Sequence, residues 1–248
     1  MGKQLEGKTA VVTGGTSGIG LATAKRFVEH GAFVFITGRR EDALNAAVAD
    51  IGDSVTGVQS DVSRLDDLDR LYQTVEDSGR RLDVLFVNAG GGEFAALEQV
   101  TEEHFQSIFD TNVKGALFTV QKAMPLLNDG ASVILSGSTA GGAKAFGVYA
   151  ASKAAIRSFS RTWANELSGR AIRVNTVVPG PTDTPGITGL SPSPEEAAVM
   201  REGFARSIPL GRMGRPEEVA DVALFLAGDQ STFVTGIELF VDGGQRQV

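Results

Sequence analysis

Short apolar runs rich in β-branched residues recur along the chain, and stretches with helical periodicity separate them. Such runs predict strands, which we place at residues 10–13, 33–37, 55–59, 84–88, 132–136, 173–178 and 238–241. Apolar residues spaced by three and four predict helices, here at residues 19–30, 41–51, 65–78, 102–127, 149–167 and 216–226. This alternation predicts a parallel sheet covered by helices on both faces. Right-handed crossovers then give a doubly wound α/β fold of about seven strands.

Residues 185–209 depart from the alternation, because they mix proline and glycine with a helical pattern over 194–207. We interpret them as a substrate-loop insertion within a single domain that spans residues 1–248. Insertions of this kind often close over a ligand as lids.

The bulk composition excludes several classes of protein. Hydrophobic residues make up 42% of the chain, yet no uncharged apolar run reaches the roughly 18 residues that a membrane helix needs. The first strand is expected by Lys8, which leaves no room for a signal peptide, so we expect a cytoplasmic protein. A net charge of −7 disfavours nucleic acid and anionic membranes as partners. The chain has no cysteine, and His30 and His104 lie where structural roles are expected, so we predict no metal site.

The first predicted strand runs directly into a glycine-rich turn and then a helix, which are the parts of a dinucleotide site. Gly14 permits the tight turn, Gly18 lets the backbone approach a pyrophosphate, and Gly20 lets the helix pack closely on the strand. The free N–H groups at the start of the helix would face the anion. The residues expected to bind cofactor phosphate are Gly14, Thr16, Ser17, Gly18, Ile19 and Gly20.

Tyr149 and Lys153 lie four residues apart in a predicted helix, so their side chains share one helical face. A free tyrosine has a pKa of about 10, and acid–base work near neutral pH requires a shift of roughly 3 units, or about 4 kcal/mol. A cation about 4 Å away supplies about 4 kcal/mol at an effective dielectric constant of 20. The pair is a candidate acid–base centre, although an exposed helix with an incidental tyrosine and lysine has the same spacing.

Further motifs follow one another in a characteristic order. They are residues 13–20 (Thr-Gly-Gly-Thr-Ser-Gly-Ile-Gly), Asp61-Val62, Asn88-Ala89-Gly90, Asn112, Ser138, Tyr149 with Lys153, Pro179-Gly180 with Thr184, and residues 241–244 (Val-Asp-Gly-Gly). Together they resemble the short-chain dehydrogenase/reductases of the single-domain type. The resemblance implies a Rossmann fold and an oxidoreductase that acts on CH–OH groups or carbonyls with a nicotinamide cofactor.

The resemblance assigns catalytic roles to four residues. Tyr149 would be the general acid for reduction and the base for oxidation, and Lys153 would hold the nicotinamide ribose and lower the pKa of Tyr149. Ser138 would hydrogen-bond the substrate oxygen. Asn112 would bend its helix and hold a water molecule for proton relay.

Ser136 is an alternative to Ser138 for this role. The serine and the tyrosine are two residues further apart in many relatives, and Ser136 would restore that separation. Residues 138–141 match the Ser-x-x-Gly turn of the family, whereas Ser136 belongs to an apolar strand. We therefore choose Ser138 and infer a two-residue deletion in the loop 142–148. The side chains expected at the entrance are Glu93, Phe94, Lys144 and Phe146.

The end of the second predicted strand bears on the choice of cofactor. An acidic residue there would bind the ribose of NAD and repel the 2′-phosphate of NADP. This chain carries Arg39 and Arg40 instead, and arginine suits phosphate because its planar fork donates two charge-assisted hydrogen bonds. Pairing with Glu41 or Asp42 is the alternative. We expect NADP rather than NAD, although Ser17 stands where NADP-dependent relatives often carry a basic residue.

The resemblance implies further cofactor contacts. Asp61 and Val62 would lie at the adenine, with a helix cap before Ser63 as the alternative role of Asp61. The remaining candidates are Asn88, Ala89 and Gly90 beside the adenosine ribose, Pro179, Gly180 and Thr182 around the nicotinamide, and Thr184 at the cofactor phosphate.

These features predict an NADPH-dependent reductase of small ketones or aldehydes, reversible as an alcohol dehydrogenase. An NAD-dependent alcohol or sugar dehydrogenase is one alternative, and a non-catalytic NADP-binding regulator is another. A regulator has no need of the phenol of Tyr149, which favours an enzyme.

The helices at 102–127 and 149–167 carry more apolar side chains than one core-facing stripe needs. These are Phe105, Ile108, Phe109, Leu117, Phe118, Phe159 and Trp163. In the resembled family the two helices pair across a two-fold axis, and Ile237, Leu239 and Phe240 would suit a second interface. We expect a homotetramer, with side chains that only face the sheet as the alternative.

Overall fold

The computed structural model describes residues 2–191 and 193–246. Within them, parallel strands form one sheet of seven in the order β3-β2-β1-β4-β5-β6-β7. The strands are β1 (Thr9–Val12), β2 (Phe33–Gly38), β3 (Val55–Gln59), β4 (Leu82–Val87), β5 (Leu127–Ser136), β6 (Arg173–Pro179) and β7 (Glu238–Val241). The strand order reverses between β1 and β4, as in other doubly wound sheets. The predicted fold class is therefore confirmed.

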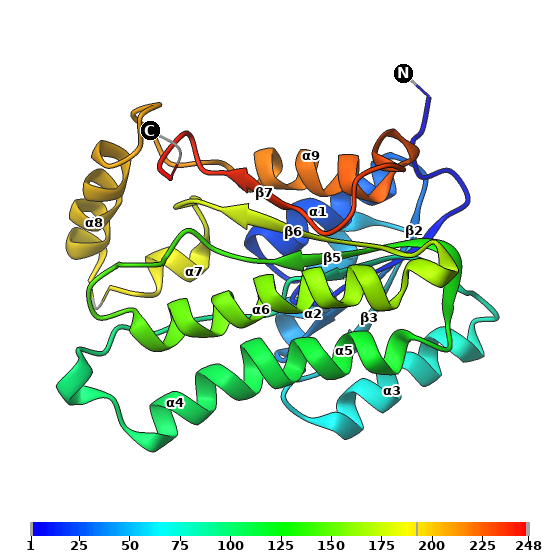
Figure 1. The fold of residues 1–248 in the computed structure, drawn as a ribbon, viewed down its shortest axis with the longest axis horizontal. Helices are drawn as coiled ribbons and strands as arrows, with labels where there is room; N and C mark the ends of the chain where they lie inside the picture. The colour runs from blue at the N-terminus through cyan, green and yellow to red at the C-terminus, as the bar shows by residue number, and fades with distance from the viewer. Residues whose placement is uncertain (1, 192, 247–248) are drawn as a thin grey trace.

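Helices cover both faces of this sheet (Figure 1). The helices are α1 (Gly18–Glu29), α2 (Glu41–Ile51), α3 (Leu65–Asp77), α4 (Glu102–Phe109), α5 (Gly115–Ala123), α6 (Gly147–Glu166), α7 (Pro185–Thr188), α8 (Pro194–Arg206) and α9 (Pro216–Ala227). Helices α3, α5 and α6 cover one face, and α1, α2 and α9 cover the other. None of the described helices is long and apolar enough to cross a membrane.

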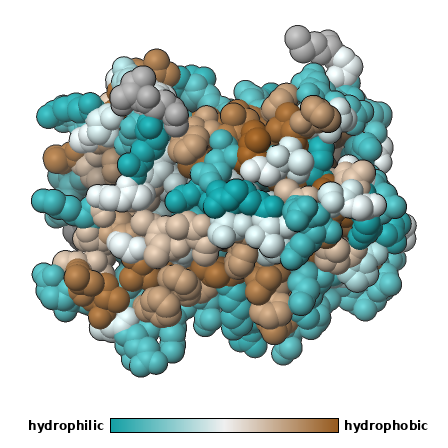
Figure 2. Space-filling view, viewed as in Figure 1, coloured by the Kyte–Doolittle hydropathy of each residue, from teal (hydrophilic) through white to brown (hydrophobic). Residues whose placement is uncertain are grey.

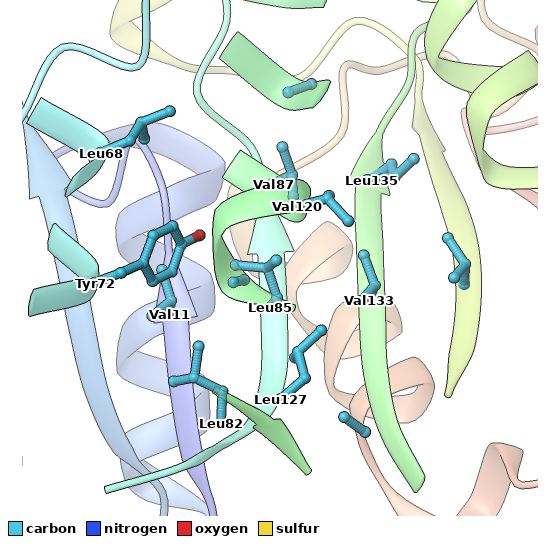
Figure 3. Close-up of a cluster of buried hydrophobic side chains, with 14 of the residues drawn as sticks. Val11, Leu68, Tyr72, Leu82, Leu85, Val87, Val120, Leu127, Val133 and Leu135 are labelled. Carbon is cyan, nitrogen blue, oxygen red and sulfur yellow. The ribbon is translucent and has the colours of Figure 1, made fainter. Parts of the chain in front are cut away.

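The inner strands bury both of their faces, whereas the edge strands β3 and β7 are only partly buried, and burial on both faces explains the continuous apolar runs in the sequence. Adjacent strand residues point to opposite sides of the sheet, so Val11 joins the core beneath α3, α5 and α6 while Val12 joins the core beneath α1, α2 and α9. Figure 3 shows the first of these clusters, including Tyr72. The Tyr72 hydroxyl donates to the backbone carbonyl of Thr119 at 2.6 Å, which satisfies the polar end of this buried ring.

The single helix predicted at 102–127 is wrong in detail. Helix α4 passes into a π-helical segment, Asp110–Lys114, before α5 begins, and α5 ends at Ala123. Pro125 has no backbone N–H and disfavours helix in the residue before it, so the chain leaves the helix and enters β5.

The predicted insertion at 185–209 contains α7 and α8, which lie beyond the carboxyl ends of β6 and β7 (Figure 1). Pro192, within the insertion, lies outside the described residues. The insertion thus borders the edge of the sheet where ligands bind in doubly wound folds.

Candidate active site

A cleft of about 880 Å³ runs along the carboxyl ends of the strands. The predicted site residues that line it are Gly14, Thr16, Ser17, Gly18, Ile19, Gly20, Arg39, Asp61, Val62, Asn88, Ala89, Gly90, Ser138, Tyr149, Lys153, Pro179, Gly180, Thr182 and Thr184. Arg40, Asn112 and Lys144 are not in the lining. The cleft therefore brings together segments from both ends of the chain.

The glycine-rich turn is tied to the end of β4. Gly14 has a φ of +65°, and a Cβ atom on Gly20 would lie only 2.1 Å from the carbonyl oxygen of Gly14. Thr13 Oγ1 accepts hydrogen bonds from the backbone N–H groups of Asn88 and Ala89, at 3.0 and 3.1 Å. Asn88 Nδ2 in turn donates to the carbonyl oxygens of Thr13 and Gly14. The turn and the β4 end form one unit, with Asn88 serving as its internal support.

The start of α1 suits an anion. The Ser17 side chain makes no capping hydrogen bond. Within the described residues, the backbone N–H groups of Gly18, Ile19 and Gly20 have no hydrogen-bond acceptor. All three residues line the cleft. Unpaired N–H groups at the positive end of a helix dipole fit the pyrophosphate of a dinucleotide.

The two arginines after β2 differ in position. Both are exposed, but Arg39 lines the cleft and Arg40 does not. In the described part of the chain neither guanidinium lies within 4.0 Å of a carboxylate, so the alternative pairing with Glu41 or Asp42 is not seen. Arg39 is a cation at the cleft wall whose charge the described side chains do not neutralise.

Asp61 forms a turn with Ser63 and does not cap α3, whose N-cap residue is Arg64. Its Oδ1 atom accepts hydrogen bonds from the backbone N–H and the hydroxyl of Ser63, at 3.0 and 2.7 Å. Asp61 also lines the cleft beside Val62, which is buried and packs closely on Gly115. These hydrogen bonds with Ser63 therefore fix the direction of a carboxylate that borders the cleft.

Tyr149 and Lys153 project from the first turns of α6, beside Ser138. Lys153 is 5% exposed, and its Nζ donates to the backbone carbonyl of Ser136 at 2.9 Å and lies 5.7 Å from the centroid of the Tyr149 ring. Burial lowers the pKa of Lys153 to about 8.

The pKa of Tyr149 was expected to be lowered by Lys153, but in the protein alone it is raised. Burial raises the pKa of Tyr149, and the neighbouring Ser138 hydroxyl opposes that shift. Lys153 does not reverse it, because its ammonium group is itself buried and is hydrogen-bonded to a backbone carbonyl. Spacing along a helix established proximity, but it could not reveal the loss of solvation.

Asn112 lies in the π-helical segment and is 2% exposed. Its Nδ2 donates to the Gly91 carbonyl and to Ser152 Oγ, both at 2.9 Å, and its Oδ1 accepts from the Gly91 N–H at 3.0 Å. The amide thus ties the backbone after β4 to α6, one residue before Lys153. In this structure Asn112 supports the cleft from behind its wall.

The chain end supplies two site residues that the sequence did not reveal. Thr139 Oγ1 donates to Gln245 Oε1 at 2.9 Å, and Arg246 Nε and Nη2 donate to the Thr139 carbonyl at 2.9 and 2.5 Å. Asp242 forms the turn that places them, because its Oδ2 accepts from the Arg246 N–H. The Val-Asp-Gly-Gly motif was the only available signal, and it indicates a turn rather than the segment that the turn touches.

Comparisons with known proteins agree with this architecture. The family model described as "Enoyl-(Acyl carrier protein) reductase" matches residues 14–246. An oxidoreductase from Sarocladium schorii, asL5, is 46% identical over 99% of this chain and 98% of its own length. An NADP-dependent (R)-specific alcohol dehydrogenase from Lentilactobacillus kefiri is 37% identical over 98% of both chains.

A solved structure of similar shape is a 3-ketoacyl-(acyl-carrier-protein) reductase from Brucella melitensis complexed with NADH. It is 32% identical, has a TM-score of 0.89, and is matched over 97% of this chain and 99% of its own. Within the described residues no group of three or more metal-ligating side chains could hold a metal ion. With matches over nearly its whole length, the chain belongs to the short-chain dehydrogenase/reductase family of NAD(P)-dependent oxidoreductases.

Proposed function

We propose that this enzyme reduces a small ketone or aldehyde with NADPH and runs in reverse as an alcohol dehydrogenase. One observation carries the proposal. The cleft places Ser138, Tyr149 and Lys153 at one end and the glycine-rich turn with Arg39 at the other. A dinucleotide would span these ends, with its nicotinamide beside the acid–base pair.

The net reaction converts a carbonyl compound, NADPH and a proton into an alcohol and NADP⁺. When bound, the cofactor supplies the hydride that reduces the carbonyl carbon. Tyr149 gives its phenolic proton to the carbonyl oxygen, and Ser138 donates a hydrogen bond that stabilises negative charge on the same atom.

Lys153 holds the nicotinamide ribose and favours ionisation of the Tyr149 phenol once its ammonium group faces the cleft. Asn112 keeps the Gly91 backbone against α6, which fixes the wall beside the pair. Thr182 would face the nicotinamide end, and Thr184, which lies beside Gly18, would reach the cofactor phosphate.

Arg39 supports NADP over NAD. It lines the cleft, and no described carboxylate within 4.0 Å competes for its guanidinium. The NADP-dependent relative from Lentilactobacillus kefiri agrees with this choice. An NAD-dependent dehydrogenase remains the second candidate, because the similar Brucella melitensis reductase was solved with NADH.

A cofactor and carbonyl screen tests the proposal. We expect the purified enzyme to oxidise NADPH in the presence of ketones or aldehydes, with a higher kcat/KM for NADPH than for NADH. Tight NADPH binding without turnover over a broad carbonyl panel would favour the regulator instead. A strong preference for NADH would show that Arg39 does not bind the 2′-phosphate of NADP.

We further propose that the protein is a cytoplasmic homotetramer. Hydrophobic residues gather over α4, α5 and α6 on the face seen in Figure 2. Phe105 is 45% exposed and Phe233, near β7, is fully exposed, which supports two interfaces. Phe118, Phe159 and Trp163 instead pack partly on the core, as the alternative reading of these helices anticipated. Light scattering decides, since a stable active monomer near 26.0 kDa excludes the assembly.

A further inference from the structure

Three aromatic rings form a continuous wall at the substrate end of the cleft. The ring centroids of Phe94 and Phe146 lie 4.6 Å apart, and those of Phe146 and Tyr149 lie 4.8 Å apart. All three residues line the cleft. The wall therefore leads from the entrance to the proposed proton donor.

The backbone around the wall is tightly constrained. Ala145, just before Phe146, has a φ of +57°, a left-handed conformation that costs about 1 kcal/mol or more in a residue other than glycine. Its carbonyl accepts a hydrogen bond from the Ala95 N–H at 2.8 Å, which joins the two loops that carry Phe94 and Phe146. A Cβ atom on Gly92 would lie 2.6 Å from the Tyr149 ring, so the loop rests directly on that ring. The strained turn is thus held where it aligns the rings.

The rings are not fully covered by the described part of the chain. Phe94 is 46% exposed. Apolar side chains of the insertion, Ile187, Leu190 and Phe204, line the same cleft. Glu93, whose side chain is 82% exposed, is the charged residue next to Phe94. The apolar surface between these walls suits a flat, apolar group.

We propose that the preferred substrates are ketones or aldehydes that carry an aryl or similarly flat apolar group next to the carbonyl, and that Phe146 and Phe94 select them by stacking. This inference rests on the proposed function, because the carbonyl must lie at Tyr149. An aryl ring beside the carbonyl would then continue the sequence of rings from Tyr149 toward the entrance. Ring pairs at these separations attract one another beyond the simple burial of apolar area.

Steady-state kinetics with NADPH test the selection, using acetophenone and butan-2-one as the paired substrates. We expect the wild-type kcat/KM ratio of acetophenone to butan-2-one to be about 100. Phe146→Ala should lower this ratio roughly tenfold and Phe94→Ala several-fold. Phe146→Tyr should restore the ratio, because it returns an aromatic ring. Phe105→Ala is the matched control for Phe94→Ala, since Phe105 is as exposed as Phe94 but lies outside the cleft lining.

Calorimetry separates this inference from the proposed function, because acetophenone cannot be reduced by enzyme loaded with NADP⁺. A Kd that rises about tenfold in Phe146→Ala supports the aromatic site even when turnover is absent, and that combination would refute only the reductase. Equal losses for both ketones would show that Phe146 merely supports Tyr149. A wild-type preference for butan-2-one or for a linear 3-oxoacyl thioester would also overturn the inference.

Discussion

The nucleotide end and the substrate end of the cleft are built in different ways. At the nucleotide end, short polar residues at the tips of neighbouring strands bond to one another, as Thr13 does to Asn88. At the substrate end, Thr139 is held by Gln245 and Arg246, with a separation of 107 positions between Thr139 and Arg246. The first end joins segments that follow two neighbouring strands, β1 and β4, whereas the second joins segments that follow β5 and β7, which are not neighbours in the sheet.

This contrast implies a division of labour. Strand tips offer N–H groups in a geometry that suits any phosphate, so the nucleotide end is generic apart from Arg39. Loops and the chain end determine the shape around the reacting carbonyl. Changes at the nucleotide end should therefore alter cofactor affinity and choice, while changes at the substrate end should alter turnover and selectivity.

The largest effect should come from Tyr149→Phe, which removes the proton donor and leaves the ring. We expect kcat to fall about 10³-fold, while the Kd for NADPH, measured by cofactor fluorescence, changes by less than about twofold. Tyr72, the other tyrosine of the chain, is the matched control. Tyr72→Phe loses a buried hydrogen bond to Thr119 and should cost about 1 kcal/mol of stability without loss of turnover. Substantial activity in Tyr149→Phe would remove the proposed mechanism.

Cofactor choice offers the next largest effect. Arg39→Asp should lower the ratio of kcat/KM for NADPH to kcat/KM for NADH roughly 100-fold, so that NADH becomes the preferred cofactor. The reason is that a carboxylate repels the 2′-phosphate and accepts hydrogen bonds from the ribose hydroxyls. Arg40→Asp introduces the same charge change outside the cleft lining. It should move the ratio by only a few-fold through long-range electrostatics. Equal responses of the two variants would show that Arg39 makes no phosphate contact.

The kcat values of Ser138→Ala and Ser136→Ala should differ by about 30-fold. Ser138→Ala removes the hydroxyl beside the Tyr149 phenol and should slow turnover about 30-fold. Ser136 contributes its backbone carbonyl to Lys153, and alanine retains that carbonyl. Ser136→Ala should therefore remain near wild type in single-turnover assays, and the reverse order would mean that the loop deletion was misassigned.

Arg246→Ala probes the long-range support of the substrate end. It removes two hydrogen bonds to the Thr139 carbonyl, next to Ser138. We expect kcat to fall about fivefold, equivalent to about 1 kcal/mol, with the Kd for NADPH unchanged. Arg246→Lys retains one donor and should recover part of the loss. If Arg246→Ala instead weakens NADPH binding with kcat intact, the chain end serves the nucleotide rather than Ser138.

The smallest effect concerns Lys153, where the two ends meet. Burial lowers its pKa from 10.5 in the unfolded chain to about 8 in the folded protein. Between these values the unfolded chain binds more protons, so the stability contribution of Lys153 should improve as pH rises. Relative to Lys153→Met, wild type should gain about 1 kcal/mol between pH 8 and pH 9 in urea unfolding. A flat difference would show that Lys153 stays solvated.

The fold was largely predictable, because alternating apolar runs and helical patterns specify a parallel sheet. The resemblance implied a bend at Asn112, but periodicity alone did not predict the π-helical segment, since Phe109, Val113 and Leu117 keep helical spacing across it. Pro125 was a usable signal for the early end of α5, and its effect on the preceding residue follows from sterics alone.

The nucleotide end of the candidate site was more predictable from the sequence than the substrate end. Contiguous motifs such as residues 13–20 predicted the residues of the nucleotide end that line the cleft, because a strand and a turn position them locally. Arg246 could not be predicted, because its partner is distant in sequence and carries no matching signal. The direction of the Tyr149 pKa shift was also inaccessible, since burial depends on how Phe146 and the Gly92 loop pack around the ring.

The π-helical segment Asp110–Lys114 accommodates one extra residue between α4 and α5. A π turn holds one residue more than an α turn. Deleting a single residue there would therefore restore a regular helix and leave the faces of α4 and α5 nearly aligned. The stacked Phe105 and Phe109 rings would keep their side of the molecule, but Asn112 would lose its place against Gly91. A single deletion would thus loosen the wall beside the acid–base pair without redirecting the α4 surface.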